Sequence, residues 1–152
     1  MMNIKLRILL VIIAAFATLA PVCVLSGGDT RTVNQTVELA SGALVEVVGE
    51  NAEVRIRRVS GNTLELEATL HNEEYVDFYT QILAGVPVSH FVISATTSTG
   101  GTTTANSLID IGIPEGVVLT VRTTNRPITV DAAVVSSATL TTVKGKVSVM
   151  NS

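Results

Sequence analysis

The sequence predicts an all-β fold in which short β-coil repeats stack on one another, preceded by an N-terminal apolar helix. Three segments carry the prediction, because each has an aliphatic anchor, a polar stretch with Gly or Asn, and two alternating aliphatic residues. These segments are Val47–Ile56, Val121–Val130 and Leu140–Val149. The pattern is typical of strand, turn and strand, so residues that stand out by repetition are expected to be structural.

The composition fits one domain with an aliphatic core. Hydrophobic residues make up 47% of the 152 residues, yet there is no Trp, with three Phe and two Tyr. Val, Ile, Leu and Ala must therefore fill the core, and these residues suit stacked strands. Once Lys5 and Arg7 are set aside, 8 basic side chains face 13 acidic ones, which excludes a nucleic-acid phosphate backbone as a partner.

The N-terminus is typical of a secretory signal. A short basic segment, Met1–Arg7, precedes the apolar run Ile8–Ala20, and small residues follow. We predict that residues 1–26 are either a signal peptide cleaved after Ser26 or an uncleaved membrane anchor helix. Counted through to Leu25, the apolar stretch has 18 residues, the lower limit for a membrane span. Both alternatives export the rest of the chain.

Cys23 is the only cysteine, so neither an internal disulfide nor a thiolate zinc cluster can form. Its position within the apolar run raises the alternative of a lipid-acceptor cysteine. Pro21 and Val22 fit that motif badly, because small residues are expected before the modified cysteine.

Strand patterns begin after a polar stretch, residues 27–36, that we expect to be a linker without structure of its own. A domain of stacked strands is predicted over residues 37–152. Its first two strands, near Val37–Leu39 and Leu44–Val47, are expected to be joined by a tight turn at Ser41–Gly42.

The clearest strand pair in the sequence is predicted at residues 54–70. Val54 and Ile56 are expected to pair with the strand Leu64–Leu70 across a turn at Ser60–Asn62. Arg55 and Arg57 on one strand, and Glu65 and Glu67 on the other, alternate with the aliphatic residues. Cross-strand charge pairing is the expected result.

The segment 72–84 breaks the strand pattern. Its large residues Tyr75, Phe78, Tyr79 and Ile82 lie at helical spacing, which predicts a short helix or turn. Such a segment could be a binding lid or an apolar plug over one end of the stack, and the plug is favoured because the ends of stacked repeats need covering. Residues 94–107 are rich in Thr, Ser and Gly and are expected to be an exposed loop.

The last two repeats, Leu119–Val130 and Ala138–Val149, are separated by 19 residues, which allows one coil per repeat. Specific contacts follow from this alignment. The inward residues Val121, Ile128 and Val130 are expected to lie on Leu140, Val147 and Val149, respectively.

The strand pattern Leu108–Val117 contains a Pro114–Glu115–Gly116 turn and is followed by the last two repeats. Together with Val45–Leu70, this arrangement resembles the putative adhesin family, a bacterial envelope domain of unknown function. The resemblance covers most of residues 40–150. It implies a right-handed β-solenoid or a flattened stack of strands in an exported protein, and it supplies no catalytic residues. Arg126 and Pro127 stand where the family usually has Gly.

Chemistry-bearing residues are sparse. His71 and His90 are the only histidines, so neither a zinc site nor a catalytic triad is expected. The candidates for sugar cleavage are Asp110, Asp131, Arg122 and Arg126, whose spacing does not repeat. We therefore predict no enzyme activity, no cofactor and no catalytic, cofactor-binding or metal-binding residues.

The sequence thus favours a non-enzymatic, exported cell-envelope module for adhesion or for contact with a protein or glycan. The final strand, Lys146–Met150, would be an open edge able to add a partner or a second copy. An uncleaved leader would add a membrane contact. The alternative is a membrane-anchored accessory or sensor subunit that binds a ligand near residues 75–82.

Overall fold

The computed structural model describes residues 23–27, 30–97, 105–131 and 135–150. The elements are β1 (Cys23–Gly27), β2 (Thr30–Gly49), β3 (Ala52–Arg58), β4 (Thr63–His71), η1 (Glu73–Tyr75), β5 (Val76–Ala84), β6 (Val88–Thr97), β7 (Asn106–Ile113), β8 (Val117–Thr123), β9 (Ile128–Asp131), β10 (Val135–Thr142) and β11 (Val147–Met150). The prediction of an all-β fold is confirmed for these residues. No helix among them is long and apolar enough to cross a membrane.

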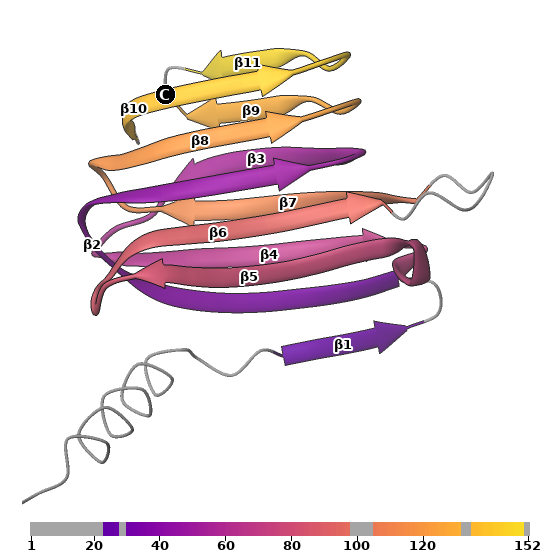
Figure 1. The fold of residues 1–152 in the computed structure, drawn as a ribbon, viewed down its shortest axis with the longest axis horizontal. Helices are drawn as coiled ribbons and strands as arrows, with labels where there is room; N and C mark the ends of the chain where they lie inside the picture. Colours follow the sequence, from indigo (N-terminus) through magenta and orange to yellow (C-terminus); the bar gives the residue numbers. More distant parts are fainter. Residues whose placement is uncertain (1–22, 28–29, 98–104, 132–134, 151–152) are drawn as a thin grey trace, which may run out of the picture.

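The long strand β2 joins two layers of strands (Figure 1). Its first part, Thr30–Glu38, pairs with β1 and β4, whereas Leu44–Gly49 pairs with β6 and β8. Gly42 lies where β2 passes from one layer to the other and has a φ of +71°, which residues with a Cβ rarely adopt. The predicted turn at Ser41–Gly42 is therefore a change of layer within one strand.

All eleven strands belong to one open sheet, folded at β2. The first layer runs in the order β1, start of β2, β4, β7, β3, β9, β11, and the second in the order β5, β6, end of β2, β8, β10. Figure 1 shows β10 and β11 at one extreme of the stack and β1 at the other.

The inward residues of both layers form one aliphatic core. Its fully buried large side chains include Phe91, Ile109, Ile111, Leu119 and Ile128. Burying a side chain of this size contributes about 1.5–3 kcal/mol. Buried apolar side chains alternate with outward, mostly polar ones along strands such as β3, β4 and β8, as the period of two requires.

The predicted contacts between the last two repeats are confirmed. In the parallel pairs β8–β10 and β9–β11, Leu140 lies opposite Val121, Val147 opposite Ile128, and Val149 opposite Val130.

The turns between the layers also stack on one another. The Asn125 side-chain amide donates to the Asn51 side-chain oxygen at 2.7 Å, and the Lys144 backbone N–H donates to the Thr124 carbonyl at 2.8 Å. Successive turns are therefore held in register by hydrogen bonds as well as by their aliphatic neighbours.

Neighbouring strands do not follow chain order, which corrects the simple picture of consecutive coils. β7 lies between β3 and β4, parallel to β3 and antiparallel to β4, so the hairpin predicted for residues 54–70 is wrong. The physical reason is burial, because Ile109, Ile111 and Ile113 of β7 are all fully buried in this central position. β1 and β5 are also antiparallel to their neighbours.

Two segments expected to be irregular are ordered as strands. The linker predicted over residues 27–36 is wrong for Thr30–Thr36, which belong to β2 and bury Val33 and Gln35. The loop predicted over residues 94–107 is shorter than expected, because β6 continues to Thr97 and β7 begins at Asn106. Residues 98–104 lie outside the described part.

Of the short helix or turn predicted for residues 72–84, the helix is wrong and a turn is present at one end only. Only Glu73–Tyr75 form a 3-10 turn, and Val76–Ala84 form the edge strand β5 paired with β6. Long-range pairing with β6 outweighs the helical spacing of the aromatic residues. The N-terminal helix predicted over residues 1–26 lies outside the described residues up to position 22, and Cys23–Ser26 belong to strand β1.

Candidate interaction surfaces

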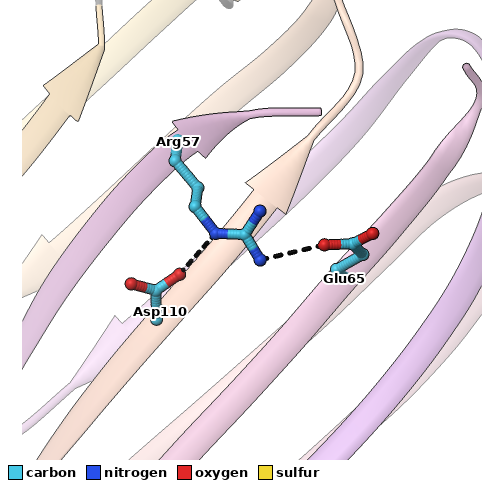
Figure 2. A network of polar contacts seen from close by, with 3 residues as sticks. All are labelled: Arg57, Glu65 and Asp110. Carbon is cyan, nitrogen blue, oxygen red and sulfur yellow. Dashed lines mark hydrogen bonds and ion pairs between the residues drawn. The ribbon is translucent and has the colours of Figure 1, made fainter. Parts of the chain in front are cut away.

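A network of charged residues lies on the outer face of the first layer (Figure 2). The Arg57 Nε–H donates to Asp110 Oδ1 at 2.9 Å, and its Nη2–H donates to Glu65 Oε2 at 2.9 Å. Three strands contribute, since Arg57 is on β3, Asp110 on β7 and Glu65 on β4. Both hydrogen bonds raise the pKa of Arg57, with the Glu65 bond the larger cause.

Gly112 makes this network possible. It lies opposite both Arg57 and Glu65 in the pairing of β7 with its two neighbours. A Cβ at this position would lie 2.5 Å from a Val59 methyl and 2.9 Å from an Arg57 guanidinium nitrogen. The missing side chain therefore leaves a path along which Arg57 crosses β7 to reach Glu65.

Other arginines of β3 are also occupied by carboxylates. Arg55 contacts Glu53 at 2.7 Å, and Arg58 contacts Glu115 at 2.8 Å. Both arginine side chains are about half exposed, so each pair contributes little to stability. The result is a polar surface whose charged groups are held in place by one another.

The outer face of the second layer is different, because it exposes apolar area beside charged side chains. His90 Nε2 lies 2.6 Å from Glu46 Oε2 across the pairing of β6 with β2. A shallow depression of about 150 Å³ lies beside them, and its lining includes Val48, Val92 and Arg122. Val48 is 40% exposed, so this face presents apolar area to solvent.

The structure separates the residues considered for chemistry. His71 Nδ1 lies 3.2 Å from the Thr30 hydroxyl in the first layer, whereas His90 is in the second. Among the described residues, no three His, Cys, Asp or Glu side chains form a group that could hold a metal ion.

The sugar-cleavage candidates are also spread apart. Asp110 is bound to Arg57 on the first layer, Asp131 ends β9, Arg122 is on β8 in the second layer, and Arg126 lies in the turn between β8 and β9. Asp110 and Arg122 therefore belong to different layers.

One end of the stack is closed by β5 and η1. The buried Gln35 side-chain oxygen accepts a hydrogen bond from the Thr80 hydroxyl at 2.8 Å, which joins the two layers. Tyr75, Phe78 and Ile82 are partly buried against the core. We call this the closed end.

The Tyr75 hydroxyl at the closed end interacts with a neighbouring negative charge. The negative charge of Glu74 and a hydrogen bond to its carboxylate raise the pKa of Tyr75. A carboxylate stabilises the neutral phenol and opposes formation of a second negative charge beside it.

At the opposite end, none of the described residues covers β10 and β11. Val147 and Val149 lie in register with Ile128 and Val130, which are 0% and 1% exposed, yet they are themselves 39% and 59% exposed. Met150, at the end of β11, is also 54% exposed. We call this the open end, and it is the edge that the sequence predicts at Lys146–Met150.

The sequence anticipated part of these surfaces. The pairing of Arg57 with Glu65 is confirmed, but Arg55 turns to Glu53 and not to Glu67. The roles of Asp110 and Gly112, and the His90–Glu46 contact, were missed. Each depends on strands that are far apart in the chain, so no local pattern could have indicated them.

No protein-family model and no curated protein matches this sequence. Among solved structures, it is similar to a putative cell adhesion protein from Clostridium sporogenes, with a TM-score of 0.49 and 6% identity over 75% of this chain and 57% of that one. A putative adhesin from Parabacteroides merdae matches with a TM-score of 0.37 and 9% identity, over 82% of this chain and 57% of that one. One from Parabacteroides distasonis matches with a TM-score of 0.30 and 14% identity, over 82% and 56%. The chain thus spans little more than half the length of these proteins.

Proposed function

We propose that this chain is a non-enzymatic, exported module of the cell envelope that makes contacts with a protein, a glycan or a second copy of itself. The observation that carries the proposal is the open end. There Val147 and Val149 lie next to the buried residues Ile128 and Val130 in the parallel strand pair, and none of the described residues covers them. Apolar side chains beside an unpaired strand edge favour the addition of another strand.

The polar faces support a structural role for the charged residues. Arg57 is held by Asp110 and Glu65, and Arg55 by Glu53, so these groups form a fixed surface. We also propose that β2–β3, β8–β9 and β10–β11 are windings of a β-solenoid, since each passes through a stacked turn from the second layer to the first.

Export is proposed from the leader, in which basic residues precede an apolar run. The test uses the lysines, because Lys144 and Lys146 are the only ones after Lys5 and both are exposed. A membrane-impermeant amine reagent is expected to label the chain in cells whose inner membrane is intact. The label is read on the peptides that contain residues 144 and 146, because cleavage of the leader would create a new N-terminal amine that also reacts. The matched control, Lys144→Arg/Lys146→Arg, should lose the label at these positions. Labelling of the wild type only after lysis would contradict export.

The contact role is tested at the open end. Cells that display the wild-type chain are expected to adhere to envelope material from the same cells, and a Val149→Asp chain to adhere at least about tenfold less. A substitution on the charged face, Arg55→Gln, is the control that should adhere normally. Equal adhesion by wild type and Val149→Asp, at equal display, would contradict the proposal.

A further inference from the structure

The two ends of the stack carry opposite charge. Residues 117–150, which form β8 to β11, contain four Lys or Arg and one Asp, so they are net positive. Residues 63–97, which form β4 to β6, contain five Asp or Glu and neither Lys nor Arg. At the open end, Lys144 and Lys146 are exposed in the last turn, and at the closed end Glu74 and Asp77 are exposed around η1 and β5.

These charges lie on the same side of the molecule. The turn between β10 and β11 and the short helix η1 both project from the right-hand edge of the stack in Figure 1, at different heights. A second copy translated along the stack would therefore place its acidic closed end against the basic turn of the first.

The edge strands match in direction and length under the same translation. β10 is parallel to β8, β2 and β6, and β5 is antiparallel to β6, so β5 of a translated copy would run antiparallel to β10. β10 and β5 have 8 and 9 residues.

β10 and β5 can therefore form an antiparallel ladder, which would bring the closed end of the next copy over the apolar side chains of Val147 and Val149. An edge that offers a strand, an apolar surface and a complementary charge together is more specific than an edge that offers a strand alone.

From these observations we propose that the chain associates head to tail, with the open end of one copy seated on the closed end of a second copy. The inference rests on the proposed function, because it names the partner of the same open end. An interface between two different ends does not close on itself under translation, so the assembly would be a linear stack of copies.

The test uses two variants of the chain, purified in its exported form. The first, Val149→Asp, disables the open end at a side chain that is already 59% exposed. The second, Glu74→Lys/Asp77→Lys, reverses the charge of the closed end at two exposed positions. Thermal melting, compared at a concentration at which the wild type is monomeric, should be unchanged in both variants and establishes that each is folded.

Sedimentation then gives the association state of each protein and of their mixture. The wild type is expected to form concentration-dependent oligomers that weaken as salt is raised, because screening reduces the attraction between the ends. Each variant alone should be monomeric, with association weakened at least about tenfold. The mixture should form a dimer and stop there, since only one intact open end and one intact closed end remain.

Other outcomes overturn the inference in distinguishable ways. A dimer of Glu74→Lys/Asp77→Lys alone would mean that two open ends meet, which contradicts head-to-tail association and leaves the proposed contact role of the open end standing. A dimer of Val149→Asp alone would mean that two closed ends meet. A wild type that stays monomeric at every concentration would exclude a second copy as the partner, whereas the proposed function depends on the adhesion test.

Discussion

The closed and open ends of the stack are built from similar strands but bury their inward residues very differently. At the closed end, Phe78 and Ile82 pack against the core, and Thr80 binds the buried Gln35. At the open end, Val147 and Val149 continue a buried rank and remain exposed. An inward position in a stacked sheet therefore becomes a core position only when another strand covers it.

The greatest loss of stability is expected at Val130, which is the register partner of Val149 in the neighbouring strand. Val130→Asp places a carboxylate at a 1% exposed site and is expected to lower the free energy of unfolding by about 4 kcal/mol. Val149→Asp, at its register partner, should lower it by about 0.5 kcal/mol or less. Denaturant unfolding measures both, and equal losses would mean that the open end is covered.

The turn at the open end provides the second comparison. A Cβ on Gly145 would lie 2.1 Å from the Arg126 carbonyl oxygen, so Gly145→Ala must push the last turn away from the one before it. We expect a loss of about 2 kcal/mol in stability, with faster amide exchange in β11.

Gly116→Ala is the control for this turn. Its Cβ would meet nothing within 4 Å, but its φ of +85° makes alanine strained, at a cost of about 1 kcal/mol. Gly145→Ala is expected to be the more harmful of the two in thermal melting, and the reverse order would argue against close stacking of the turns.

At the closed end, the hydrogen bond between Gln35 and Thr80 can be removed from one side. Thr80→Val leaves the buried Gln35 oxygen without the 2.8 Å donor and is expected to cost about 1–2 kcal/mol. The double variant Gln35→Met/Thr80→Val should recover part of that loss, because neither group then needs a partner. If the double variant loses more stability than the two single variants lose in sum, the hydrogen bond is not what joins the layers here.

The smallest effect is a titration at the closed end. Because the Glu74 carboxylate raises the pKa of Tyr75, Glu74→Gln should lower that pKa towards its ordinary value. Ultraviolet absorbance in a Tyr79→Phe background isolates the signal of Tyr75, since the chain has two tyrosines. An unchanged midpoint would mean that Glu74 does not lie beside the hydroxyl.

Local patterns predicted the last two repeats well and the middle of the chain poorly. Val121, Ile128 and Val130 could be aligned with Leu140 and its successors because the two repeats are adjacent in the chain and share one turn length. The helix predicted around Phe78 is wrong, because aromatic residues at helical spacing also fit a strand when only some of them face inward. Here Phe78 and Ile82 pack on the core, whereas Tyr79 is 53% exposed.

The surfaces depended still more on distant strands. Arg57 and Glu65 were expected to meet across a hairpin, and they do meet, but across β7, where Gly112 leaves room and Asp110 adds a second carboxylate. The local sequence shows the charges of Arg57 and Glu65, but it does not show that β7 lies between their strands. Strand order is decided by which aliphatic residues gain most from a central position, and that competition involves the whole chain.

By itself, then, the sequence determined an all-β chain and the register of its final windings, because alternation and repeat length are local properties of the backbone. Only the three-dimensional packing shows that β2 passes between layers, that β7 separates β3 from β4, and that β5 covers one end while no described residue covers β10 and β11. Whether a side chain is buried depends on the strand next to it as well as on its own sequence. Val130 and Val149 are the same residue in the same rank, and only the strand above one of them makes it part of the core.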